Sequence, residues 1–159
     1  WQAYIESGAG TSAEQIMLAA NYAGRAINIT ATTAAHAMSY KLTSMYCLPH
    51  GHAVAVCLPH VWRYMNRHLD KCIDARGAEY LARTLEDIGC EMGCNSSAEA
   101  VEVFEKLLRT LEIQNPHRLS DADIDTLTDS VNPVRLKNNP VGLDAEALRA
   151  MYETIAERS

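Results

Sequence analysis

The chain has 159 residues and a formal net charge of -6 at pH 7, from 14 Lys and Arg against 20 Asp and Glu. This length fits one domain, and the 48% hydrophobic content is ordinary for a globular protein. The acidic balance and the dispersed basic residues argue against a nucleic-acid partner, and no apolar run reaches the roughly 20 residues of a membrane helix. No signal-peptide pattern opens the chain. The odd number of cysteines favours a cytosolic setting, and we expect a cytoplasmic protein.

The chain has five cysteines: Cys47, Cys57, Cys72, Cys90 and Cys94. An odd number in a chain with an ordinary core favours reduced thiols over a disulfide framework. Cys90 and Cys94 are four residues apart and no second pair accompanies them. We therefore expect buried or half-buried thiols here rather than a zinc site.

Helical signals recur along the first half of the chain. Thr11 and Glu14 form a capping-box-like start for a helix over residues 11–27, and the threonines of residues 30–33 predict a break. A second helix is predicted over 36–45. A third begins near His50 and runs to about residue 65, with Pro59 expected to kink or restart it.

The second half continues the pattern. A fourth helix is predicted over 75–88 with Gly89 as its stop signal, and a fifth begins at Ser96 or Ser97 and closes before Asn115-Pro116. Ser120 opens a short sixth helix, residues 132–141 are expected to form a loop, and a last helix starts at 143–144. The sequence therefore predicts an all-α bundle of about seven helices, with residues 1–159 forming a single helical domain.

Four of the six histidines lie within residues 36–60: His36, His50, His52 and His60. His36 and Tyr40 are four residues apart and share one helix face, and His50 begins the next helix after a short turn. Because two helices joined by a tight turn run antiparallel, His36 and His50 are expected to converge. Two neutral imidazoles suit Zn²⁺ or Fe²⁺.

Two imidazoles are not a complete metal site, since a catalytic zinc has three protein ligands and non-haem iron commonly adds a carboxylate. No Asp or Glu lies between Gln15 and Asp70, so other ligands must come from elsewhere in the chain, from another chain or from sequence outside it. The alternative is that histidines on apolar helices are core residues. We adopt that interpretation for His60 and His68, assign His117 to a loop without a role, and leave both interpretations open for His36 and His50.

Five short motifs follow one another along the chain: Ala23-Gly24-x-Ala26-Ile27-Asn28, His36-Ala37-Met38, Leu48-Pro49-His50-Gly51, Leu58-Pro59-His60-Val61 and Asn139-Pro140. In this order, and with the fourteen-residue step from His36 to His50, they resemble the metal-binding half of iron-containing (group III) alcohol dehydrogenases. The resemblance is densest over residues 17–65.

In that family a metal, usually iron and sometimes zinc, is held by one Asp and three His, of which the last two match His36 and His50. The chain contains neither the helix with the other two ligands nor the Gly-rich dinucleotide-binding domain. The resemblance therefore implies a C-terminal fragment that lacks the N-terminal domain where NAD or NADP is mainly bound, so no cofactor-binding residue is assigned. We expect the isolated chain to be inactive, to bind a divalent metal weakly and not to bind the nicotinamide cofactor.

Tyr40 stands where many family members have a second histidine close to the nicotinamide. The segment around it resembles the branch that acts on phosphonate or other acidic carbonyl compounds, such as phosphonopyruvate reductases. Tyr40, and with lower rank His52, are therefore candidates for hydrogen bonding or proton transfer at the reacting group. Lys41, Arg25 and the hydroxyl of Thr33, together with Thr30 and Thr32, are candidates for binding an acidic head group, although all of them also fit solvated or capping roles.

The implied function is a metal-dependent, NAD(P)-linked alcohol dehydrogenase or carbonyl reductase acting on a small alcohol, aldehyde or acidic carbonyl compound. One alternative is a non-catalytic helical binding or structural module. Another is a zinc glycerol dehydrogenase-like member of the same superfamily. Homo-oligomers are expected because family members often self-associate through the helical domain.

Overall fold

The computed structural model describes residues 9–116 and 119–157. The chain divides into two compact units, residues 1–32 and 33–159. The described part of the first unit is helix α2 (Ala9–Thr30), followed by Ala31 with a positive φ of 63°. The predicted break after residue 30 is confirmed. Because α2 is already helical at Ala9, the prediction of Thr11 as its cap is wrong.

In the second unit, the described residues form seven α-helices and one 3-10 turn: α3 (Ala34–Tyr46), α4 (His50–Arg67), η1 (Leu69–Lys71), α5 (Ala78–Glu91), α6 (Ser97–Thr110), α7 (Asp121–Ser130), α8 (Pro133–Leu136) and α9 (Ala145–Glu157). The only β pairing among the described residues is one bridge between Cys72 and Val141. The all-α prediction is confirmed. None of the helices in the described ranges combines the length and the apolar character that crossing a bilayer requires.

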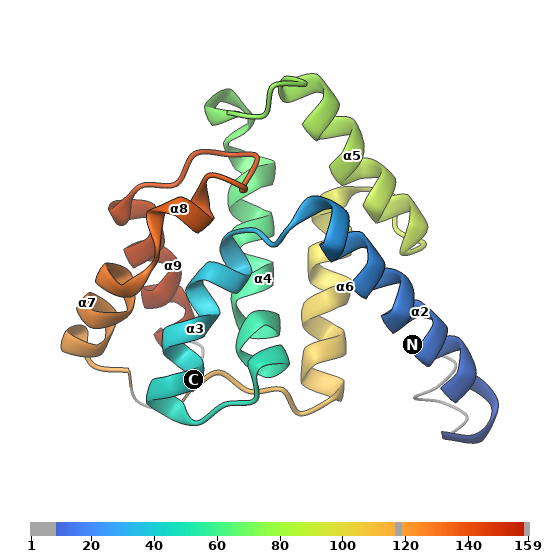
Figure 1. Cartoon of the computed structure of the whole chain (residues 1–159), viewed down its shortest axis with the longest axis horizontal. Helices are drawn as coiled ribbons and strands as arrows, with labels where there is room; N and C mark the ends of the chain where they lie inside the picture. Colours follow the sequence, from blue (N-terminus) through green and yellow to red (C-terminus); the bar gives the residue numbers. More distant parts are fainter. Residues whose placement is uncertain (1–8, 117–118, 158–159) are drawn as a thin grey trace. The chain divides into compact units, whose positions relative to one another are not determined.

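Helix α4 is the central element of the second unit, where it contacts α3, α6 and α9 (Figure 1). It contributes to two apolar clusters. Ala53, Val56, Cys57 and Val61 pack with residues of α3, α7 and α9, whereas Trp62 packs with residues of α5 and α6. Since both clusters share α4, this helix joins the two halves of the unit.

Helix α4 continues through Pro59 as one element, so the predicted restart at this residue is wrong. Proline removes one backbone hydrogen bond inside a helix. Here the residue is itself buried and is flanked by buried Cys57 and His60. Burial of the surrounding apolar side chains offsets the lost hydrogen bond.

The caps of α6 and α7 confirm two predicted helix starts. The hydroxyl oxygen of Ser96 accepts a hydrogen bond from the backbone N–H of Glu99 at 3.1 Å. Ser120 and Asp123 form a reciprocal capping box at the start of α7. All five cysteines are free thiols, as predicted. Cys57 and Cys94 are buried and Cys72 is half-buried, but Cys47 and Cys90 are exposed, so the prediction of buried or half-buried thiols is wrong for these two.

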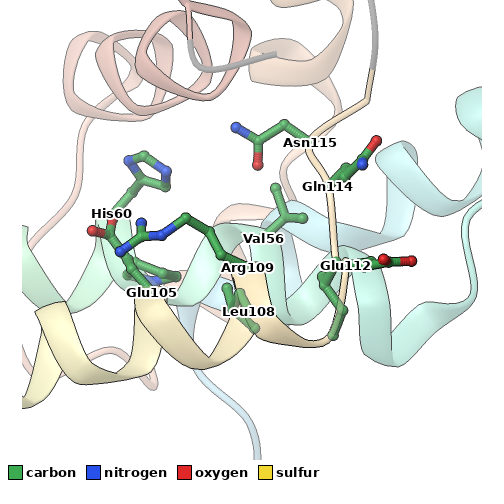
Figure 2. Close-up of a pocket in the computed structure, with 10 residues that line it drawn as sticks. Val56, His60, Glu105, Leu108, Arg109, Glu112, Gln114 and Asn115 are labelled. Atoms are coloured by element: carbon green, nitrogen blue, oxygen red, sulfur yellow. The ribbon is translucent and has the colours of Figure 1, made fainter.

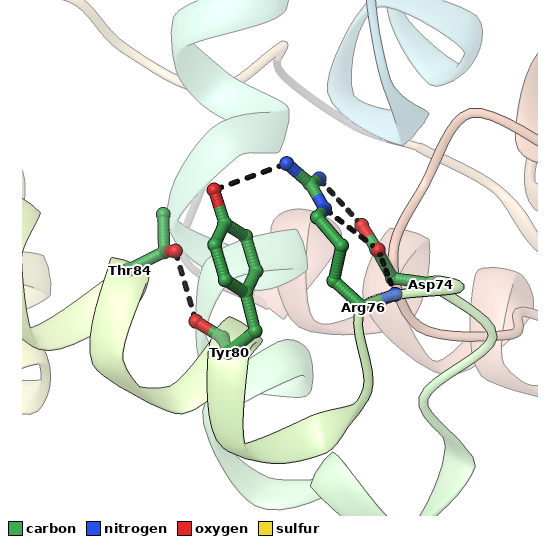
Figure 3. Close-up of polar contacts among 4 residues, drawn as sticks. All are labelled: Asp74, Arg76, Tyr80 and Thr84. Carbon is green, nitrogen blue, oxygen red and sulfur yellow. Dashed lines mark hydrogen bonds and ion pairs between the residues drawn. The ribbon is translucent and has the colours of Figure 1, made fainter.

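Helix α5 begins three residues later than predicted, because a polar turn occupies its expected first residues. The carboxylate of Asp74 accepts hydrogen bonds from the backbone N–H and the guanidinium of Arg76, which lies 4.2 Å over the ring of Tyr80 (Figure 3). Gly77 has a φ of 87°, a left-handed conformation that excludes it from a helix. Helix α5 therefore starts at Ala78.

Gly89 does not end α5, which runs to Glu91. Its role is close packing: a Cβ placed on Gly89 would lie 2.9 Å from the backbone carbonyl carbon and oxygen of Ser96. The glycine therefore allows the end of α5 to approach the start of α6.

The expected loop over 132–141 contains helix α8, so that prediction is wrong in part. The side chain of Asn132 accepts a hydrogen bond from the backbone N–H of Val134 at 2.9 Å, and Pro133 occupies the first helical turn. Asn as a cap followed by Pro is a helix start signal. The same two residues are also common in loops, which is why the pattern was misinterpreted.

We predict that Gly89→Ala destabilises the protein by about 1–3 kcal/mol, because the added methyl overlaps backbone atoms that cannot move independently. Urea denaturation measures the change. Gly51→Ala is the matched control, since a Cβ at Gly51 meets no atom within 4 Å. Equal stabilities for the two variants would contradict the close packing at Gly89.

We also predict that Asp74 titrates well below an ordinary carboxyl group. Its hydrogen bonds with Arg76 lower the pKa from 3.8 to about 2. Because the native pKa is depressed, the stabilisation of the turn is complete above about pH 4 and is lost as the pH falls toward 2. Carbon-detected NMR of the Asp74 carboxyl group follows this titration. In Arg76→Gln the midpoint should rise toward 3.8, and an unchanged midpoint would exclude Arg76 as the cause.

Candidate metal centre

The turn between α3 and α4 positions His36 and His50. Cys47 ends α3 in a left-handed conformation (φ 53°), and Pro49, with no N–H to satisfy, directly precedes α4. The two helices run antiparallel and in contact (Figure 1). His36 lies in the first turn of α3 and His50 is the first residue of α4.

The ring centroids of His36 and His50 lie 5.5 Å apart. The predicted convergence of these two residues is therefore observed. Two imidazoles that bind one tetrahedral ion at about 2.1 Å have centroids roughly 5 Å apart. The spacing thus fits two ligands of a single metal ion.

Ser39 contacts both residues of the histidine pair. Its side chain is fully buried, its hydroxyl donates to the His36 carbonyl oxygen at 2.9 Å, and its oxygen lies 3.5 Å from Nδ1 of His50. Because the serine proton is used on the carbonyl, the contact with His50 favours the tautomer that carries its proton on Nδ1. Nε2 of His50 is then the nitrogen available to a metal.

Burial lowers the pKa of His36, and the nearby imidazole of His50 lowers it further. A lowered pKa keeps the ring neutral near pH 7. Neutral imidazole is the form that binds a metal, so the electrostatics of the pair agree with its geometry.

The described residues do not complete a metal site. Across residues 9–116 and 119–157, no group of three or more His, Cys, Asp or Glu side chains could hold an ion. The pair fits two ligands of an ion, and the described residues add no third His, Cys, Asp or Glu to it.

Tyr40 lies directly beside His50. Its ring stacks on the His50 imidazole with centroids 5.4 Å apart and an interplanar angle of 23°. The predicted neighbourhood of Tyr40 and the histidine pair is therefore present. Tyr40 is 44% exposed.

Arg135 of α8 is a neighbour of this site that sequence reasoning missed. Its guanidinium donates a 2.6 Å hydrogen bond to the Tyr40 hydroxyl oxygen, and its carbon lies 4.5 Å over the Tyr40 ring. Residues 40 and 135 are 95 positions apart. The one available signal was the Asn132-Pro133 helix start, which fixes the segment that carries the arginine.

Of the other predicted site residues, His52, Thr33 and Lys41 lie in the second unit, and no side-chain hydrogen bond or ring contact within the described residues joins them to the pair. Nε2 of His52 lies 2.6 Å from the carbonyl oxygen of Gln114, so this ring is engaged elsewhere. Thr33 caps α3 without a side-chain hydrogen bond, and Lys41 follows Tyr40 on α3. Arg25 lies on α2, in the first unit, with its guanidinium carbon 5.8 Å over the Tyr22 ring.

A separate cleft of about 740 Å³ lies between α4, α6 and residues 112–115 (Figure 2). Buried His60 lines it, together with Glu105 and Arg109. His60 is a buried residue, as predicted. None of the seven predicted site residues lines this cleft, so it is distinct from the histidine pair.

Comparison with known proteins gives consistent matches. The sequence model described as "Fe-containing alcohol dehydrogenase family, C-terminal" matches residues 2–155. Phosphonoacetaldehyde reductase of Streptomyces viridochromogenes is 33% identical over 143 residues, which are 89% of this chain and 35% of that protein. Aldehyde-alcohol dehydrogenase 2 of Entamoeba histolytica is 34% identical over 104 residues, 62% of this chain and 12% of that protein.

The solved structure of an iron-containing alcohol dehydrogenase from Thermococcus thioreducens matches with a TM-score of 0.63 and 22% identity. The match covers 79% of this chain and 32% of that chain, and it shows a shared fold. The chain thus spans about a third of the length of two of these proteins and less of the third.

We predict that the chain binds Co²⁺ or Zn²⁺ weakly through the histidine pair. His36→Gln or His50→Gln should lower the affinity at least about tenfold, because each removes one of two ligands. Isothermal calorimetry measures the affinity. His68→Gln is the control, since His68 is a half-buried histidine at the end of α4 that contacts the Tyr64 ring. Equal affinities for all variants would exclude the pair as the binding site.

Proposed function

The chain belongs to the Fe-containing alcohol dehydrogenase family, and from this premise we propose that it forms the C-terminal helical part of a metal-dependent, NAD(P)-linked alcohol dehydrogenase or carbonyl reductase. The observation that carries the proposal is the His36–His50 pair, which lies in the helical domain with a spacing that fits two ligands of one ion. Under this proposal residues 1–159 form one part of a longer enzyme, whose N-terminal domain binds the dinucleotide.

The length of the match supports this arrangement. The chain aligns with 35% of phosphonoacetaldehyde reductase and with the part that the family description calls C-terminal. We assign no dinucleotide-binding residue to this chain. The choice between NAD and NADP therefore belongs to the proposed N-terminal domain.

The chain's own residues have three roles in the proposed reaction. His36 and His50 would hold Fe²⁺ or Zn²⁺, which supplies Lewis-acid polarisation of a carbonyl or alcohol oxygen when bound. Ser39 positions the His50 ring through its contact with Nδ1, while its hydroxyl is anchored on the backbone carbonyl of His36. Tyr40, whose ring stacks on His50, would offer its hydroxyl proton to the reacting oxygen.

The substrate is proposed to be a small aldehyde or ketone, with an acidic group as the favoured feature. The similarity to a phosphonoacetaldehyde reductase supports this choice. Lys41, Arg25 and Thr33 remain predicted substrate-binding residues, and His52 remains a lower-ranked candidate for proton transfer. Self-association and a cytoplasmic location also stay predictions.

We predict that the full-length protein, loaded with Fe²⁺ or Zn²⁺, oxidises NADH or NADPH in the presence of phosphonoacetaldehyde. His36→Gln and His50→Gln should each lower kcat/KM at least about 100-fold, because the reacting oxygen loses its Lewis acid. Absorbance at 340 nm follows the reaction, and His68→Gln serves as the matched control.

Other outcomes identify the alternatives. Oxidation of glycerol with Zn²⁺ and NAD, without reduction of aldehydes, would favour a glycerol dehydrogenase-like enzyme. Retention of full activity in the two ligand variants would contradict the proposed metal site. Failure to turn over any alcohol or carbonyl compound, with the metal bound, would contradict the proposed function and favour a non-catalytic module.

A further inference from the structure

Arg135 is fixed in place by one aromatic side chain. Its guanidinium stacks 4.5 Å over the Tyr40 ring and donates to the hydroxyl oxygen of the same residue. The helix that carries it, α8, contacts α3. An arginine held by both its plane and one of its N–H groups has little rotational freedom to lose when it binds a further group.

Tyr40 connects this arginine to the histidine pair. One neighbour of the tyrosine is Arg135, and the other is His50, at a ring-centroid distance of 5.4 Å. His50 lies 5.5 Å from His36. The guanidinium of Arg135 is therefore linked to the proposed metal ligand His50 through one shared neighbour, the Tyr40 side chain. This separation is on the scale of a small organic molecule.

No carboxylate is paired with Arg135 within the described residues. Other arginines in those residues do form such pairs: Arg63 with Glu105, Arg76 with Asp74, and Arg149 with Asp125 and Glu153. The guanidinium of Arg135 is exposed and uses one N–H on Tyr40. A guanidinium has five N–H donors, so donors remain for an oxyanion.

From this arrangement we propose that Arg135 binds the anionic group of the substrate, while the carbonyl group of the same substrate lies at the histidine pair. The ligand class is a short aldehyde or ketone that carries a phosphonate, phosphate or carboxylate one or two carbons from the reacting carbon. This inference rests on the proposed carbonyl reductase function. It adds the residue that selects acidic substrates.

Arg135 fits this role better than Lys41. Lys41 is five residues after His36, which places it about 140° around α3 from that histidine, whereas Tyr40 is only about 40° away. Arg135 contacts Tyr40, and Tyr40 in turn contacts His50. A guanidinium also matches two oxygens of a phosphonate or carboxylate at once, which an ammonium does not.

The competing explanation is purely structural, with Arg135 serving only to attach α8 to α3. The two explanations predict different effects on acidic and uncharged substrates when the arginine is removed. A structural arginine affects all substrates alike, whereas an anion-binding arginine affects acidic substrates and leaves an uncharged aldehyde of similar size unchanged.

The test compares Arg135→Gln with Lys137→Gln in the full-length enzyme. Lys137 follows Arg135 by two residues, is exposed, and loses the same charge in its variant. The substrates are propanal, 3-oxopropanoate and the phosphonate aldehyde used above. We expect Arg135→Gln to raise KM for the two acids about 10- to 100-fold, with less than a twofold change for propanal. Lys137→Gln should change neither.

The kinetic results decide between these explanations. A larger loss for the phosphonate than for the carboxylate would support a dianionic substrate. Equal losses for the two would support a site that binds any acidic group. A partial recovery in Arg135→Lys, which keeps the charge without the planar fork, would also support it. Equal losses for propanal and the acids, or no loss for the acids, would overturn it.

A binding measurement separates this inference from the proposed function. Methylphosphonate titrated into the wild-type enzyme should give saturable heat that is lost in Arg135→Gln and kept in Lys137→Gln. Heat that is the same in Arg135→Gln and the wild type would overturn the anion site even if the enzyme reduces aldehydes. Saturable, Arg135-dependent heat without any turnover would support the anion site and reject the reductase function.

Discussion

The close packing of α3 against α4 is the constraint on which both the core and the candidate site depend. Small residues line the contact, among them Ala34, Ala35, Ala37 and Ala53, which are at most 5% exposed. Small side chains let two helices approach closely, and the left-handed Cys47 and the following Pro49 set the angle at which the chain reverses. The same approach that buries Met38 and Leu42 places His36 against His50. A substitution that separates these helices therefore disturbs stability and the spacing of the histidine pair together.

Contacts from distant segments hold α3 in this position. The hydroxyl of Tyr152, in α9, donates to the Met38 carbonyl oxygen at 2.9 Å within the core. On the other side of α4, the indole N–H of Trp62 donates to the hydroxyl oxygen of Ser97, which donates in turn to Asn66. Buried polar groups that are paired in this way specify one arrangement of the helices. The histidine pair thus stands on rigid helices, which is the support a metal ligand needs.

Helical periodicity and cap residues were sufficient to predict most of the helices, because those signals are local. The convergence of His36 and His50 was also predictable, since only a three-residue turn separates their helices. Two of the features that escaped prediction show what such local signals lack. The start of α5 depends on the positive φ of Gly77, a property that a glycine permits without requiring it. The contact of Arg135 with Tyr40 joins residues 95 positions apart, and only the packing of α8 on α3 makes them neighbours.

The distribution of charge explains why the contacts of Tyr40 matter. Helices α3 and α4 bring no carboxylate to the histidine pair, because the chain has none between Gln15 and Asp70. A divalent ion at the pair and the guanidinium of Arg135 would both attract an oxyanion. An oxyanion bound directly to the ion would occupy the position that a reacting carbonyl oxygen needs. Tyr40 contacts both His50 and Arg135, so its side chain links the position of the ion to that of the guanidinium. A substrate with its acid group and its carbonyl group apart satisfies both cations at once, whereas a simple oxyanion satisfies only one.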